Sequence, residues 1–409
     1  MKMIQAIALF FFFFWPRVQV NRIFEVMWIL EMFVFTQAGS FFMGSTLFKT
    51  LFVDESVRDY PLVGEFKSKL DLPVVYVEHI NEVYRIVNQS DDPVTEGKKH
   101  IVLTRNKSQF LKKCPGTAQY TCCGYKILHI GSYCFMDCSY CILQAFFHPP
   151  VLQFFVNTGD MFDELERYFA QPGISRIGTG EYTDSLIWDR WAGVSEQLVQ
   201  RFAAQDRAVL ELKTKTTSVK HLEHLEHNRK TIMAWSLNTE RVIRTDERRT
   251  STLDARLKAA RQCQDWGYPL AFHFDPIVIY EGCEAEYIQV IERLFSEISP
   301  DSVVYISLGT FRFIPLLKRI IQKRFEDSDI VYGEFITGLD GKMRYFKPLR
   351  IRVCKAIYEA IRKMAPSVTV YYCMESETVW RETMGFYPGE DGLSGLLDQS
   401  VANHCGVKP

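Results

Sequence analysis

The sequence predicts an α/β protein whose central parallel sheet is built from repeated strand–helix units. From residue 125 onward, short apolar runs rich in β-branched residues alternate with amphipathic segments of helical period. Each run is followed by a segment long enough for a crossover helix, which predicts parallel strands in an open, partial barrel or in a doubly wound sheet. The six predicted strands are 126–130, 175–180, 208–214, 231–238, 270–279 and 303–308.

Helix signals separate these strands. The third helix opens with the Ser-Thr cap at 251–252. Towards the C-terminus, the β-branched and aromatic run 367–373 predicts a strand, and 375–384 predicts a helix that a glycine ends. The last twenty residues, which contain His404 and Cys405, are rich in glycine and predict coil. The helices predicted between the strands are 160–170, 192–204, 253–266 and 284–298.

Composition narrows the class of protein. The chain has 409 residues, 47% of them hydrophobic and 24% charged, which excludes a disordered or collagen-like chain. The 48 basic and 49 acidic residues nearly cancel, so any contact with nucleic acid must come from a local patch. The 11 cysteines are an odd number, which argues against a fully paired disulfide framework and predicts reduced thiols in the cytoplasm.

Four regions are expected along the chain. Residues 1–46 form a hydrophobic extension, and three interpretations stay open for it: a signal or membrane anchor, a structural element, or translation from an upstream start codon. Apart from this extension, no stable membrane partner is expected. An N-terminal α/β region is expected at 47–124, the partial barrel at 125–325, and a C-terminal region with a hairpin and a terminal strand and helix at 326–409.

The strongest chemical signal is the cysteine triplet in GSYCFMDCSYCILQ, directly after the first predicted strand. Cys134, Cys138 and Cys141 have the spacing C-x3-C-x2-C. Ordinary 4Fe–4S carriers and structural zinc sites use four protein ligands. Three thiolates on one short loop therefore indicate a cluster with one iron left open, and a zinc site that borrows a distant fourth cysteine is the alternative. The nearby Cys122 and Cys123 are interpreted as ordinary thiols.

The triplet, with Tyr140 before its last cysteine, resembles the signature of the radical S-adenosylmethionine superfamily. The segments CSYCILQ, TKTTSVKHL, WSLNTERVI and YPLAFHFDPIVIYEG resemble more specifically the spore photoproduct lyase family, over about residues 48–385. The resemblance implies a partial (βα)6 TIM-like barrel, a 4Fe–4S cluster, S-adenosylmethionine and an external electron donor of flavodoxin or ferredoxin type. It also implies repair of a methylene-bridged thymine dimer in DNA through a 5′-deoxyadenosyl radical.

The same resemblance assigns cofactor contacts to residues that follow the predicted strands. Glu181 would accept from the ammonium group of S-adenosylmethionine, and Lys215 would contact its carboxylate. Ser236 and Asn238 match positions that hydrogen-bond the cofactor. Each assignment has an alternative. Glu181 could be a surface carboxylate and Lys215 a solvated lysine, and Ser236 and Asn238 could cap the turn after their strand.

The sequence departs from the family where hydrogen is returned to the product. The family's donor is a cysteine on the loop after the second strand, whereas this chain has Tyr182. Of the family's two radical-relay tyrosines, Tyr140 is present and the second position is Ile142. Three explanations stay open: Tyr182 donates instead, another thiol such as Cys283 has taken over, or the substrate does not need this step.

A basic stretch predicts a nucleic-acid contact. Residues Lys342–Lys363 contain eight basic side chains and one acidic one, with aromatic residues between them, and the segment 338–341 has a hairpin signal. In the resembling family a hairpin of this region inserts into DNA. The alternative is an amphipathic helix with a solvated basic face after Pro348. Two rival functions also stay open: an enzyme with the same cofactors and a non-DNA substrate, and a non-catalytic metal-binding DNA-binding module.

Overall fold

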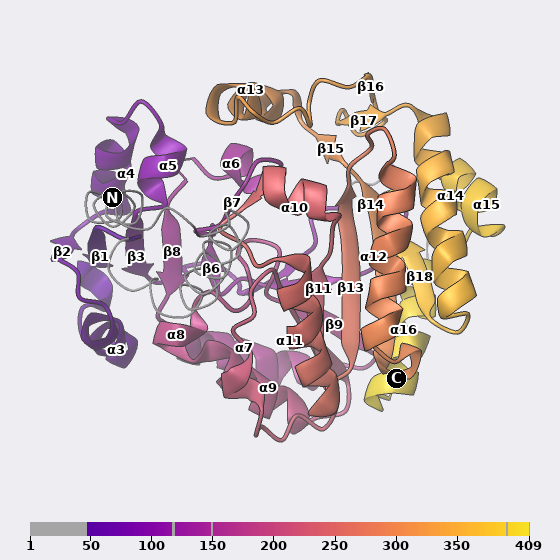
Figure 1. Ribbon diagram of the computed structural model, residues 1–409. Helices are drawn as coiled ribbons and strands as arrows, with labels where there is room; N and C mark the ends of the chain where they lie inside the picture. The colour runs from indigo at the N-terminus through magenta and orange to yellow at the C-terminus, as the bar shows by residue number, and fades with distance from the viewer. Residues whose placement is uncertain (1–46, 117–118, 149, 390–391, 409) are drawn as a thin grey trace, which may run out of the picture.

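The computed structural model describes residues 47–116, 119–148, 150–389 and 392–408 (Figure 1). Its largest sheet has eight strands in the order β18-β14-β13-β11-β10-β9-β5-β4. All neighbours in it are parallel except β4 and β5. The strands are β4 (Leu111–Lys113), β5 (Lys126–Leu128), β9 (Ser175–Gly178), β10 (Ala208–Thr214), β11 (Thr231–Ser236), β13 (Leu270–Ile277), β14 (Val303–Thr310) and β18 (Thr369–Tyr372).

Contacts across this sheet show that it curls into a partial barrel. Glu211 of β10 accepts hydrogen bonds from Tyr125, which precedes β5 (3.1 Å), and from Tyr305 of β14. Because β10 and β14 are separated by two strands, these contacts can only form over a concave face. The partial barrel, one of the two architectures open from the strand pattern, is confirmed. The six predicted strands all form, with ends within two residues of those predicted.

Helices cover the outside of the barrel (Figure 1). Thr252 caps α11 by accepting from the backbone N–H of Ala255, as the Ser-Thr signal predicts. The helices of this part are α7 (Thr158–Phe169), α8 (Asp189–Ala192), α9 (Val194–Ala203), α10 (Glu240–Asp246), α11 (Leu253–Asp265), α12 (Cys283–Glu297), α13 (Pro315–Arg324) and α14 (Lys347–Met364), with short 3-10 turns at Glu55–Val57, Lys220–Leu222 and Pro300–Ser302.

A second sheet lies beside the barrel, at the left of Figure 1. Its order is β2-β1-β3-β8-β6, and its last two strands come from the part of the chain after residue 125. Backbone pairing therefore joins the N-terminal segment to β6, the strand directly before the cysteine triplet. The division of the chain into domains stays a prediction. The elements are β1 (Thr50–Asp54), β2 (Val74–Val77), β3 (His100–Thr104), β6 (Gly131–Ser132), β8 (Leu152–Phe155), α3 (Pro61–Lys69), α4 (Ile80–Asn88) and α5 (Pro93–Gly97).

The C-terminal part adds a small three-stranded sheet of β15 (Arg312–Phe313), β16 (Phe335–Thr337) and β17 (Met343–Tyr345), and the helices α15 (Glu377–Met384) and α16 (Gly392–Cys405). The prediction of coil for the last twenty residues was wrong. Leu393, Leu397 and Val401 recur at a spacing of four and are fully buried, which outweighs the glycines of the segment. Cys405 is buried too, and its carbonyl accepts from Lys230 (2.8 Å).

The hydrophobic extension 1–46 lies outside the described residues, so its three interpretations stay predictions. In the part of the chain that the structure does describe, no helix has the length and apolar character needed to span a bilayer.

Candidate active site

The three cysteines of the triplet lie on the loop between β6 and the short helix α6 (Leu143–Phe146). Cys138 is buried, and Cys134 and Cys141 are partly exposed; all three are free thiols. The loop contains the two-residue strand β7 (Asp137–Cys138), which pairs antiparallel with β12 (Glu247–Arg248). The loop therefore rests on a segment more than one hundred residues further along the chain.

The donor set fits a three-thiolate cluster. Burial raises the pKa of Cys134 and raises that of Cys138 to about 12, so both thiols need a cationic partner to ionise. Among the described residues, no three His, Cys, Asp or Glu side chains converge on a point that could hold one metal ion. A cubane does not require such convergence, because each cysteine binds a different iron. The residues present thus suit an iron–sulfur cluster better than a single zinc ion.

A buried arginine, Arg324, contacts the cluster loop. Arg324 at the end of α13 donates to Asp92 (3.1 Å), to Asp137 within the loop (3.1 Å) and to Gln144 of α6. The amide of Gln144 in turn donates to the backbone carbonyls of Ser139 (2.9 Å), Cys138 and Cys141. Arg324 therefore holds the loop directly through the Asp137 carboxylate and, by way of Gln144, through backbone carbonyls.

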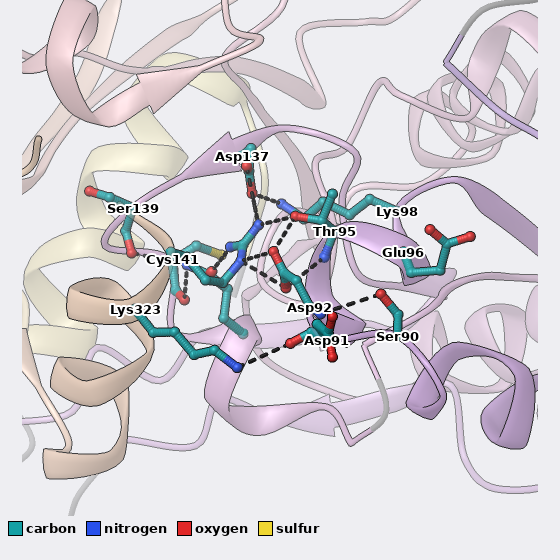
Figure 2. Close-up of polar contacts among 12 residues, drawn as sticks. Ser90, Asp91, Asp92, Thr95, Glu96, Lys98, Asp137, Ser139, Cys141 and Lys323 are labelled. Atoms are coloured by element: carbon teal, nitrogen blue, oxygen red, sulfur yellow. Dashed lines mark hydrogen bonds and ion pairs between the residues drawn. The ribbon is translucent and has the colours of Figure 1, made fainter. Parts of the chain in front are cut away.

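The N-terminal segment adds further contacts to the same loop. Lys98, which is buried, donates to the carboxylate of Asp137 (2.7 Å) and to the carbonyl of Met136. Figure 2 shows Lys98, Asp92 and Thr95 grouped around Asp137. Two cations thus share one carboxylate of the loop, which holds the pKa of Asp137 below its usual value against the opposing effect of burial.

Tyr140 is held by a chain of buried charges. Its hydroxyl donates to Glu247, which also accepts from Arg256 (2.5 Å). Arg256 donates as well to the carbonyl of Ser236 (2.8 Å), so the cluster loop and the end of β11 are linked. Burial and the neighbouring Glu247 raise the pKa of Tyr140 well above its usual value. The phenol therefore stays protonated and fixed in orientation.

Tyr182 lies against the other side of the cluster loop. Its carbonyl accepts from the N–H of Tyr133, the residue before Cys134 (2.7 Å). Its ring lies 4.6 Å from that of His129 and stacks on that of Phe146 in α6. Burial raises its pKa. The structure thus brings Tyr182 next to the cysteine triplet, although 41 to 48 residues separate them in sequence.

Of the two predicted charged cofactor contacts, one is paired and one is free. Glu181 forms an ion pair with Lys213, and Gly180 before it leaves no room for a side chain, because a Cβ there would lie 2.8 Å from that of Lys213. Among the described residues Lys215 forms no ion pair. Its ammonium lies 5.8 Å from the Tyr140 ring and acts to lower the pKa of Cys138, so it faces the cluster loop.

Of the two predicted polar contacts, Ser236 is the last residue of β11 and Asn238 lies two residues beyond it. Ser236 is 7% exposed, and its carbonyl is held by Arg256. Asn238 is 1% exposed and its side chain is occupied: it accepts from Tyr287 (2.7 Å) and donates to the carbonyl of Pro276 (2.8 Å). This geometry favours the interpretation of Asn238 as a residue that fixes the strand end.

The thiol suggested as a substitute donor lies elsewhere. Cys283 is fully buried at the start of α12, and its sulfur contacts the neighbouring Glu284 (3.5 Å). The rings around Tyr182 come from other segments. Cys283 is therefore not among the residues that the structure places in contact with the Tyr182 ring, and its role as a substitute donor stays a prediction.

Sequence reasoning missed several residues that support the site. Asp184 accepts from the backbone N–H of Lys215 (2.9 Å) and from Thr214 (2.8 Å), and burial raises its pKa. It follows Tyr182 in GTGEYTDSL, so its position after a strand was a usable signal. Three further residues have no local motif that marks them: Glu247, Arg256 and Arg324. Glu247 and Arg324 contact the cluster loop and α6 from distant segments, and Arg256 holds Glu247.

A curled parallel barrel with three cysteines on the loop after its first parallel strand defines the class of radical S-adenosylmethionine proteins. The family model described as "Spore photoproduct lyase" matches residues 48–370, most of the chain. The chain belongs to the spore photoproduct lyase family. The resemblance stated from the motifs is thereby confirmed.

Individual relatives agree with this assignment. The spore photoproduct lyase of Bacillus subtilis is 26% identical over 318 residues, which cover 76% of this chain and 89% of that protein. The one from a Geobacillus strain is 29% identical over 320 residues, covering 76% and 90%. A solved spore photoproduct lyase with a cysteine-to-alanine substitution superposes with a TM-score of 0.72 at 23% identity, over 80% of this chain and 100% of that one. Another, complexed with dinucleoside spore photoproduct, gives a TM-score of 0.70.

Proposed function

We propose that this protein is a radical S-adenosylmethionine lyase that acts on the spore photoproduct, a thymine lesion in DNA. The observation that carries the proposal is the loop of three free cysteines beside the end of β9, in a chain of this family. Cys134, Cys138 and Cys141 would hold a 4Fe–4S cluster there, which would supply the electron for reductive cleavage of S-adenosylmethionine. The chain itself binds, orients and shields the reactants.

Each site residue has a distinct part in this proposal. Cys134, Cys138 and Cys141 bind the cluster. Lys215, a cation without an ion-pair partner in the described part of the chain, binds the carboxylate of S-adenosylmethionine, and Glu181 accepts from its ammonium group. The remaining two act at the end of β11: Ser236 contacts the cofactor, and Asn238 positions the strand.

The substrate follows from the relatives. Solved family members are described as complexed with dinucleoside spore photoproduct, and one as holding AdoMet as well. The same lesion in DNA is the proposed substrate here. An external electron donor of flavodoxin or ferredoxin type and a reducing, cytoplasmic environment complete the proposal, because the cluster has to be reduced in each cycle.

The basic stretch Lys342–Lys363 contributes less charge than its sequence suggests. Arg344 and Arg350 are buried in ion pairs with Asp340 and Glu375. Most of the segment is the amphipathic helix α14, the alternative interpretation of this stretch. The hairpin of β16 and β17 does form, and it exposes two apolar side chains, Ile336 and the 76% exposed Leu339, beside the polar Thr337. We therefore assign to this hairpin contact with bases rather than with phosphates.

Tyr140 and Tyr182 are the proposed radical-handling residues. Tyr182 occupies the place of the family's donor cysteine and lies against the cluster loop. In the proposed step its O–H bond breaks and a C–H bond forms on the product radical, which leaves a tyrosyl radical to be reduced. The hydrogen-bonded Tyr140 lies on the cluster loop itself, where it can take part in that reduction.

The test is anaerobic reconstitution followed by incubation with dinucleoside spore photoproduct, S-adenosylmethionine and a chemical reductant. Thymine product and 5′-deoxyadenosine are expected, both lost in Cys138→Ala. Cofactor cleavage without lesion repair would reject the lesion as substrate and favour a non-DNA substrate. A colourless protein with stoichiometric zinc would instead favour a non-catalytic DNA-binding module.

A further inference from the structure

A groove of about 880 Å³ lies between α7 and the edge strand β4. Four cations line it: Lys112 and Lys113 of β4, Lys126 of β5 and Arg167 of α7. The sequence gives little sign of it, because the four residues come from three separate segments. Folding brings them to one edge of the barrel sheet.

The positive charge of the groove is not neutralised by the protein. Among the described residues, none of the four cations has a carboxylate within ion-pair distance. The one acidic residue lining the groove, Glu164, is already occupied, because its two oxygens accept from the backbone N–H groups of Phe110 and Leu111, each at 2.9 Å. Such an uncompensated cluster attracts a polyanion.

The groove begins beside the candidate active site. Phe110, which lies between the lining residues Gln109 and Leu111, accepts from the backbone N–H of His129 (2.9 Å), and the His129 ring packs against Tyr182 at 4.6 Å. The charge of Lys112 also helps to lower the pKa of His129. A ligand in the groove would therefore lie close to a molecule held at Tyr182.

A residue between β4 and β5 also contacts the hairpin. The segment that leaves β4 carries Tyr120, whose ring packs 4.3 Å from the guanidinium of Arg344 in β17. One segment thus joins the basic edge of the barrel to the hairpin. The two surfaces differ in chemistry, since the groove presents four cations without ion-pair partners in the described part of the chain, and the hairpin exposes the apolar Ile336 and Leu339.

We propose that this groove binds the phosphates of the DNA strand that flanks the lesion. The proposal rests on the proposed function, because it assumes a lesion held beside Tyr182. A DNA strand that runs past the site carries one negative charge per nucleotide, and cations without protein partners can neutralise it and release counterions. A dinucleoside lesion has no flanking phosphates to engage the groove.

The experiment compares two triple variants. The groove variant Lys112→Gln/Lys113→Gln/Arg167→Gln loses three cations that line the groove. The control variant Arg190→Gln/Arg207→Gln/Lys258→Gln loses three exposed cations on other elements that form no ion pair among the described residues. Thermal melts establish that both fold. Affinity for a lesion-containing duplex is measured from 50 to 200 mM salt, and turnover is measured on the dinucleoside.

The groove variant is expected to bind the duplex at least tenfold more weakly at 100 mM salt, with its salt slope reduced by about two to three, and to turn over the dinucleoside normally. Equal salt slopes for groove and control variants would overturn the proposal, as would an equal loss on duplex and dinucleoside. A wild-type protein that binds duplex through the groove but repairs neither substrate would support the groove and overturn the proposed function.

Discussion

The two sides of the candidate site are built differently. The cluster loop is held by charged contacts from three distant segments, through Lys98, Glu247 and Arg324. The opposite side, around Tyr182, is an arrangement of aromatic rings from His129 and Phe146. No hydrogen bond to the Tyr182 hydroxyl is found among the described residues.

This difference separates two requirements of one site. A cluster loop must keep three thiols in fixed positions, and buried hydrogen bonds to charged groups provide that rigidity. A group that exchanges a hydrogen with a substrate must leave its reactive atom free. Tyr182 thus lies on the side with fewer hydrogen-bond constraints, whereas Ile142, the other position that differs from the family motif, directly follows Cys141 of the cluster loop.

The largest effect is expected from Arg324→Met. The side chain of Arg324 is 5% exposed, and its removal leaves Asp92 and Asp137 without a shared cation. Lys98 still pairs with Asp137 in this variant, but the hydrogen bonds of Arg324 to Asp92, Asp137 and Gln144 are all lost, and hydrogen bonds to charged groups contribute about 1.5–3 kcal/mol each. We expect a lower urea midpoint and weaker cluster loading, measured by iron content and visible absorption after reconstitution.

Arg319→Met is the matched control for this change. Arg319 lies on the same helix, is exposed and forms no ion pair among the described residues. It should leave both the midpoint and the iron content unchanged. Equal iron content in the two variants would show that the loop does not need the arginine.

Tyr140→Phe should have the next largest effect. The change removes a buried hydrogen bond to the charged Glu247, and such bonds contribute about 1.5–3 kcal/mol. Cluster loading should persist, because no cysteine is changed. Urea denaturation measures the loss of stability, and a turnover assay on the dinucleoside measures the loss of radical handling. An unchanged urea midpoint would mean that the hydrogen bond from Tyr140 to Glu247 contributes little to stability.

The sequence predicted the parts of this site that local patterns encode. Strand ends, the cysteine spacing and Tyr182 are features of short segments, and the fold brings the segment of Tyr182 against the cluster loop. Arg324, Glu247 and Arg256 were not predicted, because each reaches the loop over a long sequence separation and has no motif of its own. The helix α16 was missed because glycines hid a buried stripe of apolar residues.

A smaller effect on stability is expected from His129, on the aromatic side. Burial, with a minor contribution from Lys112, lowers its pKa to about 3, well below the value of about 6.5 in an unfolded chain. Between these values the unfolded state binds the extra proton, so stability falls as pH falls below 6.5. From pH 7 to pH 5 the loss is about 2 kcal/mol.

His129→Gln should remove this pH dependence. The variant keeps a polar group near Ser132, which lies 2.9 Å from the His129 Nε2 atom. The difference between the urea midpoints at pH 7 and pH 5 should therefore be smaller for the variant than for the wild type. A variant that loses as much stability as the wild type between the two pH values would assign the titration to other groups.

The smallest effect on stability, below about 1 kcal/mol, is expected from Tyr182→Phe, since the hydroxyl has no hydrogen-bond partner in the described part of the chain. Its effect on product should nevertheless be large if Tyr182 returns hydrogen: 5′-deoxyadenosine still forms, while repaired dinucleotide falls and side products rise. Tyr182→Cys restores the family's donor at the same place and should recover repair. If Tyr182→Phe and the wild type give the same ratio of repaired dinucleotide to side products, the hydroxyl of Tyr182 is not the donor. The lack of hydrogen bonds to this hydroxyl among the described residues would then serve substrate entry instead.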